Sequence, residues 1–144
     1  MPGTVLINFA STHGHTETIC GALGQILEKE GFEVTMTDVR KDDEASPGDF
    51  DAVVVAASIH RGTHQDEMVE WVDRHIVELV GRPNAFLSVS LSAAEQSDES
   101  KEDTRACIER FVRDTGWRPQ RTEAIAGALQ YREYDTFTRI LMNS

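Results

Sequence analysis

The sequence predicts an α/β domain built around a parallel β-sheet, and two observations lead to this fold class. Apolar, β-branched segments alternate with segments whose apolar residues recur at helical spacing along all 144 residues. The segment around Val53-Val54-Val55 is apolar on both faces, which is typical of a central strand covered by helices on both sides. The expected architecture is one domain, residues 1–144, with a sheet between two helical layers.

Five strands are expected in chain order, at residues 4–10, 33–39, 51–57, 85–91 and 122–129. Helices are expected at 16–30, 67–80 and 101–115, with polar loops at 40–49 and 92–100. Ile19, Leu23 and Leu27 share one face of the first helix, and Gly31 ends it. Because ligands of such sheets lie outside the carboxyl ends of the strands, the loops after the first, third and fourth strands form the expected site.

The composition narrows the function classes. The formal net charge of −11 disfavours a nucleic-acid partner and suits docking to a basic redox protein. The two cysteines, Cys20 and Cys107, form no Cys-x-x-Cys pair, so we expect two buried reduced thiols and no metal site. We see no signal peptide and no apolar run near the roughly 20 residues of a membrane span, so a cytoplasmic location is expected.

The stretch 9–17, Phe-Ala-Ser-Thr-His-Gly-His-Thr-Glu, is the most informative part of the chain. It joins an expected strand to an expected helix, where hydroxyls, backbone amides and the helix N-terminus can surround an anion. It lacks the lysine of a nucleoside-triphosphate loop and the glycines of a dinucleotide loop, which favours a monophosphate. The alternative is a plain helix N-cap, formed by Thr16, beside a glycine turn. The expected phosphate-binding residues are Ser11, Thr12, His13, Gly14, His15 and Thr16.

The order [Ser/Thr]-x-x-Gly-x-Thr after the first strand resembles the FMN-phosphate loop of flavodoxins. That fold is a three-layer sandwich whose five parallel strands have the order 2-1-3-4-5. Three further segments are similar to the flavodoxin-like, quinone-dependent protoporphyrinogen oxidases. They are residues 49–59 followed by Arg61-Gly62, residues 85–91, and Trp117-Arg118-Pro119 followed by 125–131 and Tyr134-Asp135. The resemblance covers essentially the whole chain, and the segment around the fifth strand is what points to the oxidase branch.

This resemblance implies non-covalent FMN and oxidation of protoporphyrinogen IX, with electrons passed to a membrane quinone. The isoalloxazine ring is expected beside the loops after the third and fourth strands, where small residues in the second loop would leave the ring accessible. The expected cofactor-binding residues there are Ala57, Ser58, Ile59, His60, Arg61, Gly62, Ser90, Leu91, Ser92 and Ala93. His60 is the candidate catalytic proton acceptor, with solvent and the flavin as alternatives. His60, Arg61 and His64 are candidate contacts to the propionates of the substrate or to a negatively charged reduced flavin, or else they are solvated loop residues.

Members of that family continue beyond the fifth strand through an insertion, a returning strand and a final helix, whereas this chain stops at Ser144. We expect residues 131–144 to form a partial insertion or a substitute helix, or else an uncovered apolar face to produce a homodimer. Tyr131, Arg132 and Tyr134 would border a substrate surface, or a surface in peripheral contact with the inner face of the membrane, or would simply pack.

Three functions therefore compete. The first is an FMN oxidoreductase acting on a porphyrinogen and a quinone. The second is a flavodoxin-type carrier of single electrons between protein partners, which the acidic charge favours. The third is a domain that no longer holds FMN.

Overall fold

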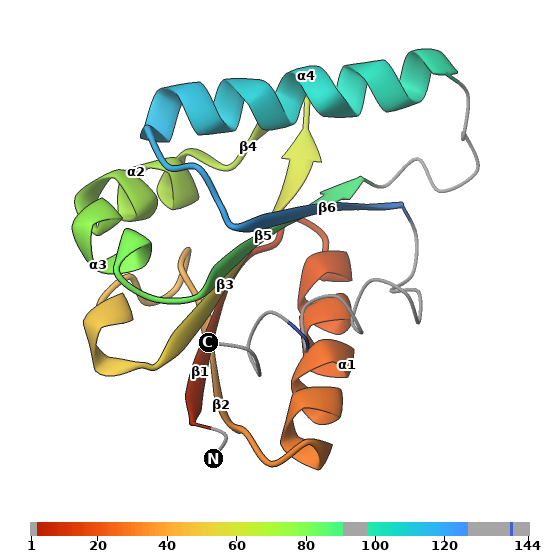
Figure 1. Ribbon diagram of the computed structural model, residues 1–144. Coiled ribbons are helices and arrows are strands. Elements are labelled where there is room, and N and C mark those ends of the chain that lie inside the picture. The colour runs from red at the N-terminus through yellow and green to blue at the C-terminus, as the bar shows by residue number, and fades with distance from the viewer. Residues whose placement is uncertain (1–2, 91–97, 127–138, 140–144) are drawn as a thin grey trace.

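The computed structural model describes residues 3–90, 98–126 and 139, and it contains the expected parallel sheet (Figure 1). The main path of the sheet has the order β2-β1-β3-β5-β6, so the predicted order 2-1-3-4-5 is confirmed. A short strand, β4, pairs antiparallel with the end of β3. The elements are β1 (Thr4–Ala10), α1 (His15–Lys29), β2 (Glu33–Asp38), the 3-10 helix η1 (Pro47–Asp49), β3 (Ala52–His60), β4 (Thr63–His64), α2 (Asp66–Arg74), α3 (Ile76–Val80), β5 (Asn84–Ser90), α4 (Asp98–Thr115) and β6 (Arg121–Ala126).

Two apolar clusters, one on each face of the sheet, make the three layers. On one face α1 packs Ile19, Leu23 and Leu27 against strand residues such as Val54. On the other face lie α2, α3 and α4, as Figure 1 shows, and their apolar side chains pack against alternate strand residues. Strand residues at successive positions therefore point to different layers, and Val53, Val54 and Val55 are fully buried.

An aromatic group fixes α4 over the sheet. Phe111 of α4 stacks on Phe86 of β5 with ring centroids 4.3 Å apart and planes 2° apart. Trp117, which follows α4, meets both rings edge-on and donates its indole N–H to Asn84 Oδ1 at 3.2 Å. The Trp117 singled out in the sequence is thus a buried anchor between α4 and β6.

Several element boundaries differ from the expected ones. The helix expected at 67–80 is divided into α2 and α3, because His75 has non-helical angles (φ −114°, ψ 20°). Strands β5 and β6 each begin one residue earlier than expected, at Asn84 and Arg121. Helix α4 begins at Asp98 rather than at Lys101. Strand β3 continues three residues past its expected end, to His60, with consequences for the site.

Several predictions lie outside the described residues. They concern the partial insertion or substitute helix at 131–144, the surface formed by Tyr131, Arg132 and Tyr134, and the end of the fifth strand at 127–129. The single-domain assignment over 1–144 and the homodimer stay predictions. Within residues 3–90 and 98–126, no helix combines the length and the apolar character that crossing a membrane requires.

Candidate functional site

The site lies where the strand order reverses, between β1 and β3. From β1 the chain moves outward to β2 and then returns to β3 on the other side of β1, and ligands of such sheets bind at this switch in strand order. Ala10, the last residue of β1, pairs with Ala57 of β3, which sets the two loops side by side. The sheet topology therefore brings together the two predicted loops.

A hydrogen bond between two of its own residues shapes the loop after β1. The backbone N–H of Gly14 donates to Ser11 Oγ at 2.9 Å, and Gly14 adopts a left-handed conformation (φ 82°) as the N-cap of α1. A Cβ at Gly14 would meet no atom within 4 Å, so the loop is open at this point and glycine is required for its φ alone. The prediction that Thr16 is the N-cap was wrong, since α1 begins at His15.

Thr16 carries a hydroxyl without a partner at the start of this helix. Its side chain is fully buried, and its Oγ1 bonds no group among the described residues. The first backbone N–H groups of a helix also have no acceptor within the helix, and these belong here to His15, Thr16 and Glu17. Several donors thus converge at the positive end of the α1 dipole, which is an arrangement suited to an anion.

Arg40 is a functional candidate that the sequence analysis missed. Its Nη1 donates to the carbonyl oxygen of Ser11 at 3.1 Å, and its Nε lies 3.4 Å from Glu67 Oε2. The loop itself contains no lysine or arginine, and the structure places the guanidinium of Arg40, from the segment after β2, against it. The parallel pairing of β1 with β2 places their carboxyl ends side by side, and that pairing was the available signal.

The segment predicted as a flavin loop is largely a hairpin. Strand β3 continues to His60, which pairs with Thr63 of β4, and the two residues between them have positive φ (Arg61 54°, Gly62 84°). Two positive φ angles in a two-residue connection are typical of a type I′ turn. The sequence analysis missed this because residues 58–62 alternate too briefly to reveal a strand. Ala57 and Ser58 are buried within the sheet, Ile59 is partly buried, and His60, Arg61 and Gly62 are exposed.

Gln65, at the N-cap of α2, ties the two loops together. Its Nε2 donates to Thr12 Oγ1 at 2.9 Å and to Ser58 Oγ at 2.6 Å. Its Oε1 accepts from the backbone N–H of Ser58 at 3.1 Å. Thr12 accepts a bond through its oxygen, so its hydroxyl proton stays available to a ligand. The contact between Gln65 and Thr12 could not be seen in the sequence, because the two residues are 53 positions apart and only the fold brings them together.

His13 and His60 bring the two loops into direct contact. Their rings lie edge to face with centroids 5.7 Å apart, and both side chains are exposed. Beside them is a pocket of 300 Å³, lined by Thr12, Arg40, His60, Thr63, His64, Gln65, Asp66 and Glu67. His15 is partly buried in the first turn of α1. Within the described ranges, no three His, Cys, Asp or Glu side chains are grouped as a metal site would require.

His64 is not the surface cation that the sequence analysis considered. It is 4% exposed, its Nε2 lies 2.8 Å from Ser88 Oγ, and its ring meets Phe86 and Phe111 edge-on at 5.2 and 5.3 Å. Burial lowers the pKa of His64 to about 4, so the ring is neutral at pH 7. Only its Nδ1 has no hydrogen-bond partner in the described part of the chain.

Other predicted residues have separate outcomes. Ser90 ends β5 at the same edge of the sheet, whereas Leu91, Ser92 and Ala93 lie outside the described residues. Cys20 is buried as expected, but Cys107 is only partly buried and its thiol donates to the carbonyl oxygen of Gly62 at 3.1 Å.

Comparison with known proteins gives concordant matches. A family model described as a flavodoxin domain matches residues 6–144. Protoporphyrinogen IX dehydrogenase [quinone] of Escherichia coli (strain K12) is 31% identical over 137 residues, which cover 95% of this chain and 75% of that protein. The protein of the same name from Leishmania major is 30% identical over 138 residues, covering 95% of this chain and 59% of its own.

Solved structures agree in fold. Oxidised flavodoxin 1 from Bacillus cereus has a TM-score of 0.63 at 14% identity and covers 96% of this chain and 95% of its own. The rubredoxin oxygen:oxidoreductase of Desulfovibrio gigas also has a TM-score of 0.63, at 12% identity, covering 96% of this chain and 34% of its own. These two structures share the arrangement of strands and helices with this chain.

Proposed function

This chain belongs to the flavodoxin domain family, and from that premise we propose that it is an FMN-dependent oxidoreductase that oxidises protoporphyrinogen IX and passes the electrons to a quinone. The observation that carries the proposal is the 31% identity, over 95% of the chain, to a protoporphyrinogen IX dehydrogenase [quinone]. The geometry at the carboxyl ends of β1 and β3 supports it, because the donors found there suit the cofactor of the family.

FMN is the cofactor of the flavodoxin domain, and the residues present fit its phosphate. The buried hydroxyl of Thr16 needs an acceptor, since an unpaired buried hydroxyl costs about 1–3 kcal/mol and no described group bonds it. A phosphate oxygen can accept from Thr16, from the hydroxyl of Thr12 and from the first amides of α1. Gly14 keeps the approach open, and Arg40 adds a positive charge beside Ser11.

Bound FMN supplies the electron acceptor for the substrate, and the residues of this chain hold and orient its surroundings. Gln65 fixes the loop containing Thr12 relative to the hairpin, so the phosphate site and the turn form one rigid unit. His60 lies at the exposed end of β3, within ring contact of His13, where it can receive a proton released by a substrate. Arg61 and Gly62 offer backbone groups at the tip of the same hairpin.

If the electron acceptor is a quinone, the proposal includes contact of the protein with a membrane. Quinones of this kind reside in the lipid bilayer, so the chain would make peripheral contact with a membrane surface while it transfers electrons. Binding of the FMN-loaded protein to quinone-containing vesicles, measured by sedimentation, tests this part. A protein that reduces quinone in detergent but never sediments with vesicles would contradict the membrane contact alone.

The proposed activity is tested by anaerobic turnover. FMN-loaded protein is mixed with protoporphyrinogen IX and a water-soluble quinone, and the fluorescence of protoporphyrin is followed against a reaction without protein. We expect porphyrin to form at a rate proportional to protein and quinone concentrations. A protein that retains FMN but forms no porphyrin above the control would overturn the proposal.

A single-electron carrier is the second candidate, and the net charge of −11 favours it. A carrier would stabilise the one-electron reduced flavin strongly, whereas the proposed oxidase exchanges electrons with its substrate in pairs. Reductive titration under argon separates the two functions. A large yield of the one-electron form, together with no porphyrinogen oxidation, would favour the carrier.

A further inference from the structure

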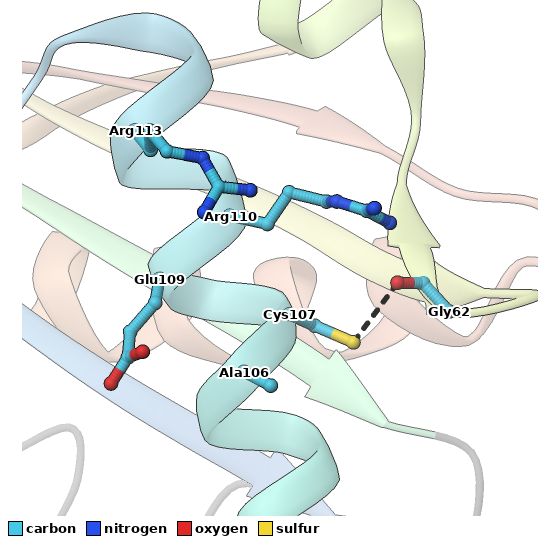
Figure 2. A pocket seen from close by; sticks show the side chains of 6 residues that line it. All are labelled: Gly62, Ala106, Cys107, Glu109, Arg110 and Arg113. Carbon is cyan, nitrogen blue, oxygen red and sulfur yellow. Dashed lines mark hydrogen bonds between the residues drawn. The ribbon is translucent and has the colours of Figure 1, made fainter.

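A second pocket lies on the other side of the hairpin turn, between the turn and α4. It has a volume of 310 Å³ and is lined by Gly62, Ala106, Cys107, Glu109, Arg110 and Arg113. Figure 2 shows the Arg110 side chain extending from α4 toward the turn, while the carboxylate of Glu109 points away from it. The dashed line in Figure 2 marks the hydrogen bond from the thiol of Cys107 to the carbonyl oxygen of Gly62, at 3.1 Å, which joins α4 to the hairpin turn.

The charge of this pocket is positive in a chain that is strongly negative overall. Arg110 is exposed and has no ion pair or hydrogen bond among the interactions found for the described residues. Arg113 has only a long contact, 3.9 Å from its Nε to the neighbouring Asp114. Arg61 lies on the turn next to Gly62, but it is not one of the residues that line the pocket. Two guanidinium groups and one carboxylate, that of Glu109, line the pocket, so its lining is positive on balance. Guanidinium groups in such a place are suited to bind the carboxylate of a ligand.

The two walls of the pocket are held rigidly. Helix α4 is fixed to the sheet by the stacking of Phe111 on Phe86, and Phe111 is the residue next to Arg110 in sequence. The hairpin is fixed by the buried bonds of Gln65 to Ser58 and of His64 to Ser88. The guanidinium of Arg110 is therefore presented from a preorganised helix toward the turn that also approaches the phosphate loop through His60 and His13.

We propose that Arg110, assisted by Arg113, binds a propionate of the porphyrinogen substrate in the pocket between the hairpin turn and α4. The inference rests on the proposed function and identifies how that site would recognise its substrate. The two propionates are the only charged groups of a porphyrinogen, and one pocket with two guanidinium groups accepts one of them in a forked geometry. The apolar ring would then extend from the pocket across the turn, toward the carboxyl ends of β1 and β3.

The test uses FMN-loaded protein and two probes, protoporphyrin IX and its dimethyl ester, which lacks the carboxylates. Quenching of porphyrin fluorescence gives the Kd of each probe for wild type and for Arg110→Gln. We expect Arg110→Gln to weaken binding of the free acid by about 3- to 10-fold, as for a partly exposed charge-assisted bond. Binding of the ester should be unchanged. Arg110→Lys should recover part of the loss because it keeps the charge but not the fork.

Arg105→Gln is the matched control, because Arg105 is an exposed arginine of the same helix that does not line the pocket. It should leave both Kd values at the wild-type level. Equal weakening of the acid and the ester by Arg110→Gln, no weakening of either, or the same effect from Arg105→Gln would each overturn the inference.

The same variants separate this inference from the proposed function. If wild type oxidises protoporphyrinogen IX and Arg110→Gln raises its KM with kcat kept, both stand. If wild type oxidises it and Arg110→Gln has the wild-type KM and Kd, the function stands and the propionate site is wrong. If wild type has no activity, the proposed function fails, and the titration with free acid and ester still decides whether the pocket binds a carboxylate.

Discussion

The substitution Thr16→Val should move two properties of the protein in opposite directions. Thr16 is fully buried in the first turn of α1, and its hydroxyl bonds no described group. Valine has nearly the same shape and replaces the hydroxyl by a methyl group. Removing an unpaired buried hydroxyl should stabilise the apoprotein by about 1–2 kcal/mol, toward the low end of the penalty for such groups. The midpoint of urea unfolding measures this gain.

The same substitution should weaken FMN binding. A hydrogen bond to a charged phosphate contributes about 1.5–3 kcal/mol, so its loss raises the Kd roughly 10- to 150-fold. We expect a Kd increase in the upper part of this range, because the Thr16 hydroxyl breaks no hydrogen bond to a described residue when it binds the phosphate. Quenching of flavin fluorescence on titration of the apoprotein measures the Kd.

Thr18→Val is the matched control for this pair of measurements. Thr18 lies in the same helix, is exposed, and donates to the carbonyl oxygen of Gly14 at 3.1 Å. The same change of residue there should alter stability and FMN affinity only slightly. The reasoning would be refuted if Thr16→Val destabilised the apoprotein as the loss of a helix cap does, or if it bound FMN as tightly as wild type.

Three further predictions concern the hairpin, the loop and pH. Gly14→Val should cost about 1–2 kcal/mol because of the left-handed φ, and it should lose flavin on desalting while Gly14→Asn keeps it; equal flavin content in both variants would contradict this. Gln65→Ala leaves the buried N–H of Ser58 without an acceptor and should lower the free energy of unfolding by about 2–3 kcal/mol, whereas wild-type urea stability would contradict the bridge. Burial lowers the pKa of His64 to about 4, so below pH about 6.5 the unfolded chain takes up a proton that the folded chain does not, and stability should fall by about 1.4 kcal/mol per pH unit between pH 6.5 and 4. Urea midpoints at pH 6.5 and 5 should show this fall in wild type and a smaller fall in His64→Gln; the same fall in both would assign it to other groups.

The parallel sheet could be predicted from the apolar pattern, whereas its strand order came from the resemblance to flavodoxins. The continuous run at Val53–Val55 marks a strand covered on both faces, and the hydroxyl-rich loop after the first strand matches a known arrangement. The helix start was misplaced because Thr16 is a good N-cap residue by type, whereas the chain uses Gly14 with a positive φ. The preference of threonine for the N-cap position is therefore not followed here, and the Thr16 hydroxyl has no partner among the described residues.

The partners of the site could not be predicted, because they come from distant segments. Arg40 reaches Ser11 only because β2 lies beside β1, and Gln65 reaches Thr12 across 53 positions of sequence. The hairpin was missed since β4 has only two residues, too few for an alternating pattern. His64 was considered a surface cation, but Phe86 and Phe111 enclose it, and that enclosure depends on the position of α4.

The most direct test of the proposed function is a single-turnover measurement of flavin reduction. FMN-loaded protein is mixed with an excess of protoporphyrinogen IX under strictly anaerobic conditions without quinone, and the visible absorbance of the flavin is recorded in a stopped-flow instrument. The account predicts that the oxidised flavin bands bleach while porphyrin forms, and that added quinone restores them. Flavin bands that stay unchanged in the presence of protoporphyrinogen IX, in a protein that a chemical reductant does bleach, would contradict the account.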